Sequence, residues 1–511
     1  MQFYLLLISQ FLIHVSLFAQ SRPTNFNVRD FGATGDGKTL DTPAINKAID
    51  AAAAAGGGTV YFPAGTYASF SLHLKSNIAL FIDQGATLLA ADSPPEGNGG
   101  YDAPEPNASD TFQDFGHSHW HNSLIWGENL ENVSILGTGI IYGKGLTRGE
   151  NRRAGIANKA IALKLCRNVI IKDITILYGG HFGILATGID NFTLDNIKMD
   201  TNRDGIDVDC CRHVRISNCT INSPWDDAIC LKSSYALGFA RATENVTITN
   251  CQVTGYDRGT FHNGTYQRKE AHLVPDKMDV TGRIKFGTES NGGFKNITIS
   301  NCVFEYCRGL ALETVDGGIL EDVTITNITM RDIVNSPFFL RLGARMRGPE
   351  GTPVGVLRRV KISNVIVYNA DVKYGSIISG IPGHDIEDVT LDNIRIVFQG
   401  GGTKQQAAIN PAEQEKGYPD PGHMGDMPSY GFFIRHVKGI ELRNIDIQYQ
   451  KEDQRPPFVL IDVKNIDVRN LKAQHAPNVP VFRMKSVTDF SLQQSLQFPD
   501  KKIAKTEQME F

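Results

Sequence analysis

Apolar and polar residues alternate along most of this chain in short runs that end on asparagine. Each run is an apolar residue, a polar one, an apolar one, a polar one and then Asn, as in Phe192 to Asn196. Alternation with a period of two indicates β-strands that bury one face. Degenerate copies start at Val133 and Val169. The regular copies end on Asn196, Asn218, Asn250, Asn301, Asn327, Asn364, Asn393, Asn444 and Asn470.

The recurrence of these runs every 22 to 50 residues or so indicates a solenoid of stacked coils. One coil cannot bury its apolar face alone, so stacking creates a continuous core. An Asn that recurs after each strand can bond through its side-chain amide to the coils above and below. We therefore predict an all-β fold, a single-stranded right-handed parallel β-helix, that forms one domain over residues 21–511.

The sequence of the N-terminal part of that domain predicts a cap that covers the open end of the solenoid. A glycine-rich loop, Phe31 to Lys38, is followed by Asp41 or Thr42 as the cap of a helix that runs to about Ala55. A turn at Gly56 and a first strand follow. Two insertions interrupt the repeat, at about 255–281 and 400–430, and the residues after Pro499 are expected to form a charged tail.

The apolar stretch from Phe3 to Phe18 predicts a signal peptide over residues 1–20, although no Lys or Arg precedes it. We therefore expect the protein to be exported, as a secreted or periplasmic protein, and to have no membrane partner. A formal net charge of −4 gives no electrostatic reason to expect nucleic acid as a partner. We expect a monomer.

The eight cysteines do not resemble a disulfide framework. Cys219, Cys251 and Cys302 occupy one register of the repeat, where they would stack in the core as small apolar groups. We predict buried thiols, and leave the pairing of Cys210 and Cys211 open. No metal site is predicted among the cysteines, because His and Asp are absent at ligand spacing.

Two acidic segments stand out on successive coils. Asp204 lies in Asn202-Arg-Asp-Gly-Ile-Asp, and Asp226 and Asp227 lie one coil later in Ser223-Pro-Trp-Asp-Asp. Stacked strands would bring the three carboxylates within about 5 Å. Carboxylates held so close repel one another, so at least one should have a raised pKa. Hydrolysis of a glycosidic bond needs such a set, an acid for the leaving oxygen and a base for water.

Together with Asp30-Phe-Gly-Ala-Thr-Gly-Asp-Gly and Val60-Tyr-Phe-Pro-Ala-Gly, these segments resemble the pectin-lyase-like β-helix proteins, and more narrowly the polygalacturonases of glycoside hydrolase family 28. The resemblance implies a catalytic domain with Asp226 as general acid, and Asp204 and Asp227 as the pair that activates water. It also implies inversion at the anomeric carbon without metal or other cofactor. Asn202, in the first motif, would contact the substrate.

The sequence departs from that family where the sugar is bound. Gly-His-Gly is missing, and an Arg-Ile-Lys triplet, Arg283 to Lys285, lies one coil early. Alternation directs Arg283 and Lys285 outward to a groove, where cations suit a carboxylated sugar. By coil counting the usual place of the triplet falls near Glu313, and Glu289 and Glu313 could instead bind neutral hydroxyls. We expect cleavage of galacturonosyl-type linkages in polygalacturonan or rhamnogalacturonan, with a polysaccharide or oligosaccharide as partner.

Loops are expected to complete the site. Trp120 could stack on a sugar and His119 could bond to it, within Gly116-His-Ser-His-Trp-His. The 255–281 insertion could close one end of the groove. Asp207 and Asp209 are read as outward-facing strand residues. Two alternatives remain open, a calcium-dependent polysaccharide lyase and a non-catalytic carbohydrate-binding β-helix.

Overall fold

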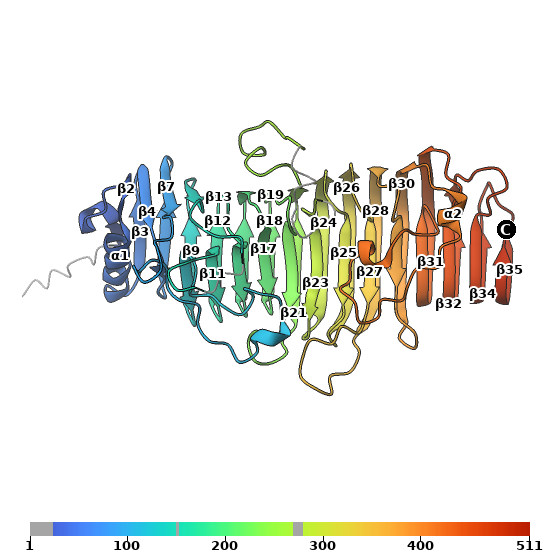
Figure 1. Cartoon of the computed structure of the whole chain (residues 1–511), viewed down its shortest axis with the longest axis horizontal. Coiled ribbons are helices and arrows are strands. Elements are labelled where there is room, and N and C mark those ends of the chain that lie inside the picture. The colour runs from blue at the N-terminus through green and yellow to red at the C-terminus, as the bar shows by residue number, and fades with distance from the viewer. Residues whose placement is uncertain (1–23, 150–152, 269–279) are drawn as a thin grey trace, which may run out of the picture.

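The computed structural model describes residues 24–149, 153–268 and 280–511 as one elongated parallel β-helix (Figure 1). Its coils follow one another along the long axis from the N-terminal cap to the C-terminal end. All strand pairs are parallel except β34 with β35. The parallel β-helix predicted from the repeat is confirmed, whereas the predicted signal peptide lies outside the described residues.

The strands stack in three columns, and the strands of one column carry the candidate site. This column contains β5 (Leu72–His73), β8 (Ile125–Glu128), β11 (Lys159–Lys164), β14 (Phe182–Thr187), β17 (Asp204–Asp209), β20 (Ile229–Ser233), β23 (Ile284–Ser290), β25 (Leu310–Thr314), β27 (Phe338–Leu342) and β29 (Ser376–Ser379). We call it the site column. It continues into the first parts of β31 (Phe432–Lys451), β32 (Phe458–Arg469) and β34 (Phe482–Gln493).

The other two columns close each coil behind the site column. The second column contains β1 (Asn25–Asn27), β3 (Gly58–Phe62), β6 (Ile78–Ile82), β9 (Glu131–Leu136), β12 (Arg167–Lys172), β15 (Asp190–Asp195), β18 (Arg212–Ser217) and β21 (Thr243–Thr249). The third contains β2 (Asp36–Leu40), β4 (Gly65–Ser69), β7 (Ala86–Ala90), β10 (Ile140–Tyr142), β13 (Thr175–Leu177), β16 (Lys198–Asp200), β19 (Thr220–Asn222) and β22 (Gln252–Thr254). Long strands span both columns from β24 (Phe294–Glu305) through β26 (Ile319–Arg331), β28 (Val356–Ala370) and β30 (Ile386–Gly400), and the short β33 (Lys472–Ala473) follows β32.

The predicted alternation produces the core and the asparagine corners. In β26 the inward residues Val323 and Ile325 are buried, whereas Thr324 between them is exposed. The corner asparagines adopt left-handed backbone angles, with φ of 57° at Asn327 and 55° at Asn364, which Asn tolerates better than most residues. The Asn364 amide donates to Asn327 Oδ1 at 3.3 Å, as expected for a corner ladder.

One corner of the ladder is an aspartate. Asn196 donates to Asp173, which has the same left-handed backbone with φ of 64°. Asn218 and Asn444 donate instead to Asp195 and Asp392, the residues just before the corners Asn196 and Asn393.

The N-terminal cap contains the 3-10 helix η1 (Val28–Phe31) and the helix α1 (Thr42–Ala54). Asp41 stands at the N-cap position but makes no capping bond with its side chain, so the predicted capping role of Asp41 is wrong. Its carboxylate instead accepts from the Thr34 and Gly35 amides at 2.7 and 3.0 Å, which ties the glycine-rich loop to the start of α1.

The predicted charged tail is a strand. β35 (Lys501–Glu510) pairs antiparallel with β34, and Phe511 packs on Phe482 with ring centroids 5.3 Å apart. The sequence interpretation missed this strand because its exposed face carries charged residues such as Lys505 and Glu507, as expected for an end strand with one face in water. β35 therefore closes the last coil and leaves its core covered.

All eight cysteines are free and buried, as predicted for thiols in the core, and this includes Cys210 and Cys211, whose pairing the sequence left open. Cys210 Sγ donates to Ser234 O at 3.3 Å and Cys211 Sγ to Ala186 O at 3.3 Å. Within the described residues, no helix is both long enough and apolar enough to cross a bilayer.

Candidate active site

The three aspartates predicted from the motifs lie together at the floor of a pocket on the site column. Asp204 begins β17, and Asp226 and Asp227 end the turn before β20, the next strand of the column. Their carboxylate oxygens lie within 4.8 Å of one another, and each residue is at most 5 % exposed. The pocket has a volume of about 320 Å³.

Three cations contact these carboxylates: Arg203, Arg283 and Lys285. Arg203 lies 3.3 Å from Asp204 and 3.0 Å from Asp226. Asp227 accepts from Arg283 Nε at 2.8 Å. Burial, followed by the charge of Asp226, raises the pKa of Asp204 well above its ordinary value. The raised pKa expected from crowded carboxylates is therefore found at Asp204.

Arg283, Lys285 and Glu313 form a buried ionic cluster with Asp227. The Lys285 ammonium lies 3.4 Å from Asp227 Oδ2 and 3.6 Å from Glu313 Oε2. The Arg283 guanidinium lies 3.8 Å from Glu313 Oε1. Every side chain of this cluster is at most 4 % exposed. The expectation that Arg283 and Lys285 turn outward from the coil is correct, but both cations reach carboxylates of the protein itself.

The strand register settles where the triplet stands. Lys285 of β23 pairs with Cys230 of β20 on one side and with Ala311 of β25 on the other. The triplet therefore follows the Asp226-Asp227 coil directly, and Glu313 belongs to the coil after it.

A second ionic network lies beside the aspartates, under the loop between β7 and β8. Lys232 contacts Glu289 at 3.2 Å and Asp207 at 3.9 Å, and His117 lies 3.4 Å from Asp207. Asp207 and Asp209 point out of the coil, as predicted, yet both are fully buried because that loop covers them. Glu289 is also fully buried, so its predicted place at the sugar is wrong: it neutralises Lys232 and Arg345.

Trp120 and His119 do not contact the pocket. The Trp120 indole is fully buried, packs on Ala162 and Leu185, and donates to Thr187 Oγ1 at 3.0 Å. His119 bonds to Glu105 O and faces Asp110 at 3.2 Å. The predicted sugar contacts are wrong, because the loop folds inward over the site column. The same histidine run supplies His117 instead.

Asn202 is buried, with 7 % exposure, and does not lie among the described residues that line the pocket. Its neighbour Arg203 does. Side chains that the sequence interpretation did not assign to the site complete the lining. These are Asp114, Phe115, His117, His181, Arg203, Lys232, Arg308, Tyr418, Asp420 and His423.

The 400–430 insertion forms one wall of the pocket. It contains α2 (Lys404–Ala407) and α3 (Pro421–Met424) and runs back toward the middle of the helix, the orange segment of Figure 1. Asp420 accepts from Arg308 at 2.5 Å, and Tyr418 OH lies 3.4 Å from the Lys285 ammonium. The described part of the 255–281 insertion supplies no lining residue, although Arg258 stacks on Trp225 beside Asp226. The 400–430 insertion therefore builds this wall, and residues 269–279 of the other insertion lie outside the described residues.

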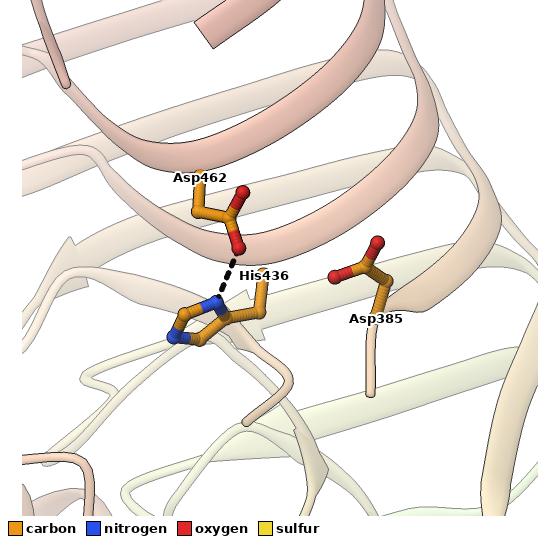
Figure 2. A group of neighbouring side chains, drawn as sticks. All are labelled: Asp385, His436 and Asp462. Carbon is orange, nitrogen blue, oxygen red and sulfur yellow. Dashed lines mark hydrogen bonds and ion pairs between the residues drawn. The ribbon is translucent and has the colours of Figure 1, made fainter. Parts of the chain in front are cut away.

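A cluster outside the pocket fastens that insertion to the coils (Figure 2). His436 Nδ1 lies 2.8 Å from Asp462, and its other ring nitrogen lies 3.3 Å from Glu413 of the insertion. Asp385 completes a set of residue types that bind metals, within 4.8 Å. The positive charge between the two aspartates comes from Lys464, 2.9 Å from Asp385 and 3.7 Å from Asp462. The cluster is thus an ion-pair anchor.

Comparisons with known proteins agree with the fold. Residues 25–257 match the family described as "Rhamnogalacturonase A/epimerase, pectate lyase-like". A probable polygalacturonase of Vitis vinifera is 26 % identical over 371 residues, 67 % of this chain and 74 % of the relative. The family 28 exopolygalacturonase of Yersinia enterocolitica superposes with a TM-score of 0.63 at 20 % identity, over 89 % of this chain and 79 % of that one.

One relative is named as a binding protein and not as an enzyme. The plasmin and fibronectin-binding protein A of Streptococcus pneumoniae is 35 % identical over 187 residues. The match covers 34 % of this chain and 24 % of the relative. The repeat and the stacked columns show a parallel β-helix, and the comparisons show that this chain is similar to a polygalacturonase in sequence and to an exopolygalacturonase in fold.

Proposed function

We propose that this protein is an exported glycoside hydrolase that cleaves galacturonosyl-type linkages in pectic polysaccharide, polygalacturonan or rhamnogalacturonan. The observation that carries the proposal is the group of three buried carboxylates, Asp204, Asp226 and Asp227, on adjacent coils at the floor of one pocket. The similarity to polygalacturonases supports the same reaction class.

The reaction divides between proton delivery and water activation. Asp226 donates a proton to the leaving oxygen, while Asp204 and Asp227 hold and deprotonate a water. Arg283 and Lys285 contact Asp227, an arrangement suited to a carboxylate that accepts a proton from water. Burial and the neighbouring Asp226 raise the pKa of Asp204, so this carboxyl can also hold a proton between turnovers.

The assignment of the acid can be tested with leaving groups. Asp226→Asn should lose most activity on a polysaccharide, whose leaving oxygen needs a proton. It should keep much more activity on a glycosyl fluoride, which needs none. Asp204→Asn should lose activity on both substrates. The reverse pattern would make Asp204 the proton donor.

The stereochemical outcome needs its own measurement. One oxygen of each carboxylate lies within 4.8 Å of the others, and this distance does not by itself match the acid–base separation of about 6.5–9.5 Å between carboxyl groups in most inverting glycosidases. Inversion is therefore proposed on the resemblance to family 28. Proton NMR of the first product formed distinguishes the anomers, and a product of retained configuration contradicts this part of the proposal.

The decisive experiment is a screen of pectic polysaccharides with the wild type and Asp226→Asn. New reducing ends released by the wild type alone support hydrolysis. A lyase would give unsaturated products that absorb in the ultraviolet, and a chelator would stop it. The match to a plasmin and fibronectin-binding protein favours a second candidate, a binding β-helix without catalysis. That candidate predicts sugar or protein binding with no product from any substrate.

A further inference from the structure

The cations of the pocket are already neutralised by the protein. Four line it, and each lies within 4 Å of a carboxylate: Arg203 by Asp204 and Asp226, Lys232 by Glu289, Lys285 by Asp227 and Glu313, and Arg308 by Asp420. Each of these four cations therefore already has a carboxylate of the protein as its counter-charge. A negatively charged sugar would enter without a partner of its own.

The lack of a cation that could pair with a charged sugar is clearest at the Lys285 end of the pocket. The Lys285 ammonium has three protons and four oxygen neighbours: Thr288 Oγ1 at 3.0 Å, Tyr418 OH and Asp227 Oδ2 at 3.4 Å, and Glu313 Oε2 at 3.6 Å. Its side chain is 3 % exposed. A carboxylate of the substrate could bond to this ammonium only by displacing one of these oxygens.

Glu313 accounts for the charge balance at that end. Its carboxylate is fully buried, makes no hydrogen bond, and faces the two cations Arg283 and Lys285. Without it, two cations would face only Asp227. A buried charge without a partner costs several kcal/mol, so one carboxylate at this place decides whether an acidic group is accepted or excluded.

We propose that the sugar ring bound at the Lys285 end of the pocket is uncharged, and that Glu313 is the positioning residue that sets this selectivity. The proposal rests on the function proposed above and narrows it. The bond that is cleaved would then join a galacturonosyl unit to a neutral sugar, or to a galacturonate whose carboxyl is esterified. Hydroxyls of such a ring can donate to Asp420 and bond to Tyr418 and His423.

The test uses three substrates, which distinguish a charged ring from one made neutral by esterification and from a neutral sugar. These are free-acid polygalacturonan, its methyl ester, and a backbone that alternates galacturonate with a neutral sugar. The wild type should have a kcat/KM for the ester or the alternating backbone at least about tenfold above that for the free acid, a difference of about 1.4 kcal/mol. Preference for the free acid overturns the proposal.

Variants connect the selectivity to Glu313. Glu313→Gln leaves a surplus positive charge on Arg283 and Lys285, so it should shift the ratio about tenfold or more toward the free acid. The double variant Glu313→Gln with Lys285→Gln restores the balance and should return the ratio toward the wild type. An unchanged ratio in a folded Glu313→Gln protein overturns the role of Glu313.

The matched control is Glu321→Gln. Glu321 of β26 is a carboxylate that also faces two cations, Arg358 at 2.8 Å and Arg359 at 2.7 Å, and it does not line the pocket. The substitution should lower stability without changing the ratio of kcat/KM values between the substrates. If no substrate yields product, the proposed function fails instead. Calorimetric titration with oligosaccharides of the same three kinds then shows whether the pocket prefers an uncharged ring, independently of catalysis.

Discussion

The ion pair between Arg308 and Asp420 offers a direct test of how the pocket wall is held. Arg308 is 2 % exposed in its side chain and Asp420 12 %. At the tip itself Tyr418 OH also accepts from Thr288 at 3.0 Å, whereas outside the tip Arg341 donates to Gln414 O at 3.0 Å and Arg435 contacts Glu413 at 3.0 Å. Arg308→Met should therefore loosen the tip around residues 417–424 while residues 411–415 stay attached.

The size of the effect follows from burial. Removing one partner of a buried pair costs about 3–5 kcal/mol, and the partial exposure of Asp420 puts this pair at the lower end. A loss of about 3 kcal/mol raises the open fraction of the tip by roughly a hundredfold, since each 1.4 kcal/mol is a factor of ten.

Hydrogen exchange measures this opening residue by residue. The amides of residues 417–424 should exchange about a hundredfold faster in Arg308→Met. Adding Asp420→Asn removes the stranded charge and should recover part of the protection. Lys172→Met, which removes a half-exposed ion pair with Asp195 on β12 and β15, away from the insertion, is the control. Unchanged exchange at the tip, or equal loosening of residues 411–415, would refute the reasoning.

Four further predictions concern the pH dependence, stability and reactivity of single buried groups. Although burial opposes it, the charges of Arg308 and Arg283 hold the pKa of Asp420 far below its usual value. The stability from this pair is present above pH of about 3.9 and lost as pH falls through the lower folded-state pKa. Protease digestion should thus release the tip only below about pH 4. Burial lowers the pKa of Lys159 to about 7. Burying the charged Lys159 ammonium therefore lowers the free energy of unfolding by its full amount below about pH 7, and by less as the pH rises above that value. Lys159→Met should raise the thermal midpoint more at pH 6 than at pH 9. Trp120→Ala should lower the free energy of unfolding by about 3–5 kcal/mol in urea without a selective loss of sugar affinity. The eight buried thiols should react with a thiol reagent only after unfolding.

The sequence by itself determined the coil and the stacking of the three aspartates. A period of two with Asn at each corner permits one arrangement, because every coil needs a neighbour to bury its apolar face. The order of Asp204, Asp226-Asp227, Arg283 and Glu313 along the site column follows from counting coils. Local pattern is sufficient for these features, since neighbours in the stack are neighbours in the repeat.

Only the tertiary structure decided what covers the column. Loops carry no period, so the sequence could not place Trp120 in the interior, bring Tyr418 and Asp420 to the pocket, or bury Asp207. It also could not indicate that Arg283 and Lys285 are neutralised by Asp227 and Glu313, because ion pairing depends on side-chain distances of a few ångströms across separate coils. The repeat fixes where the carboxylates stand, and the packing of loops and counter-charges fixes which sugar can reach them.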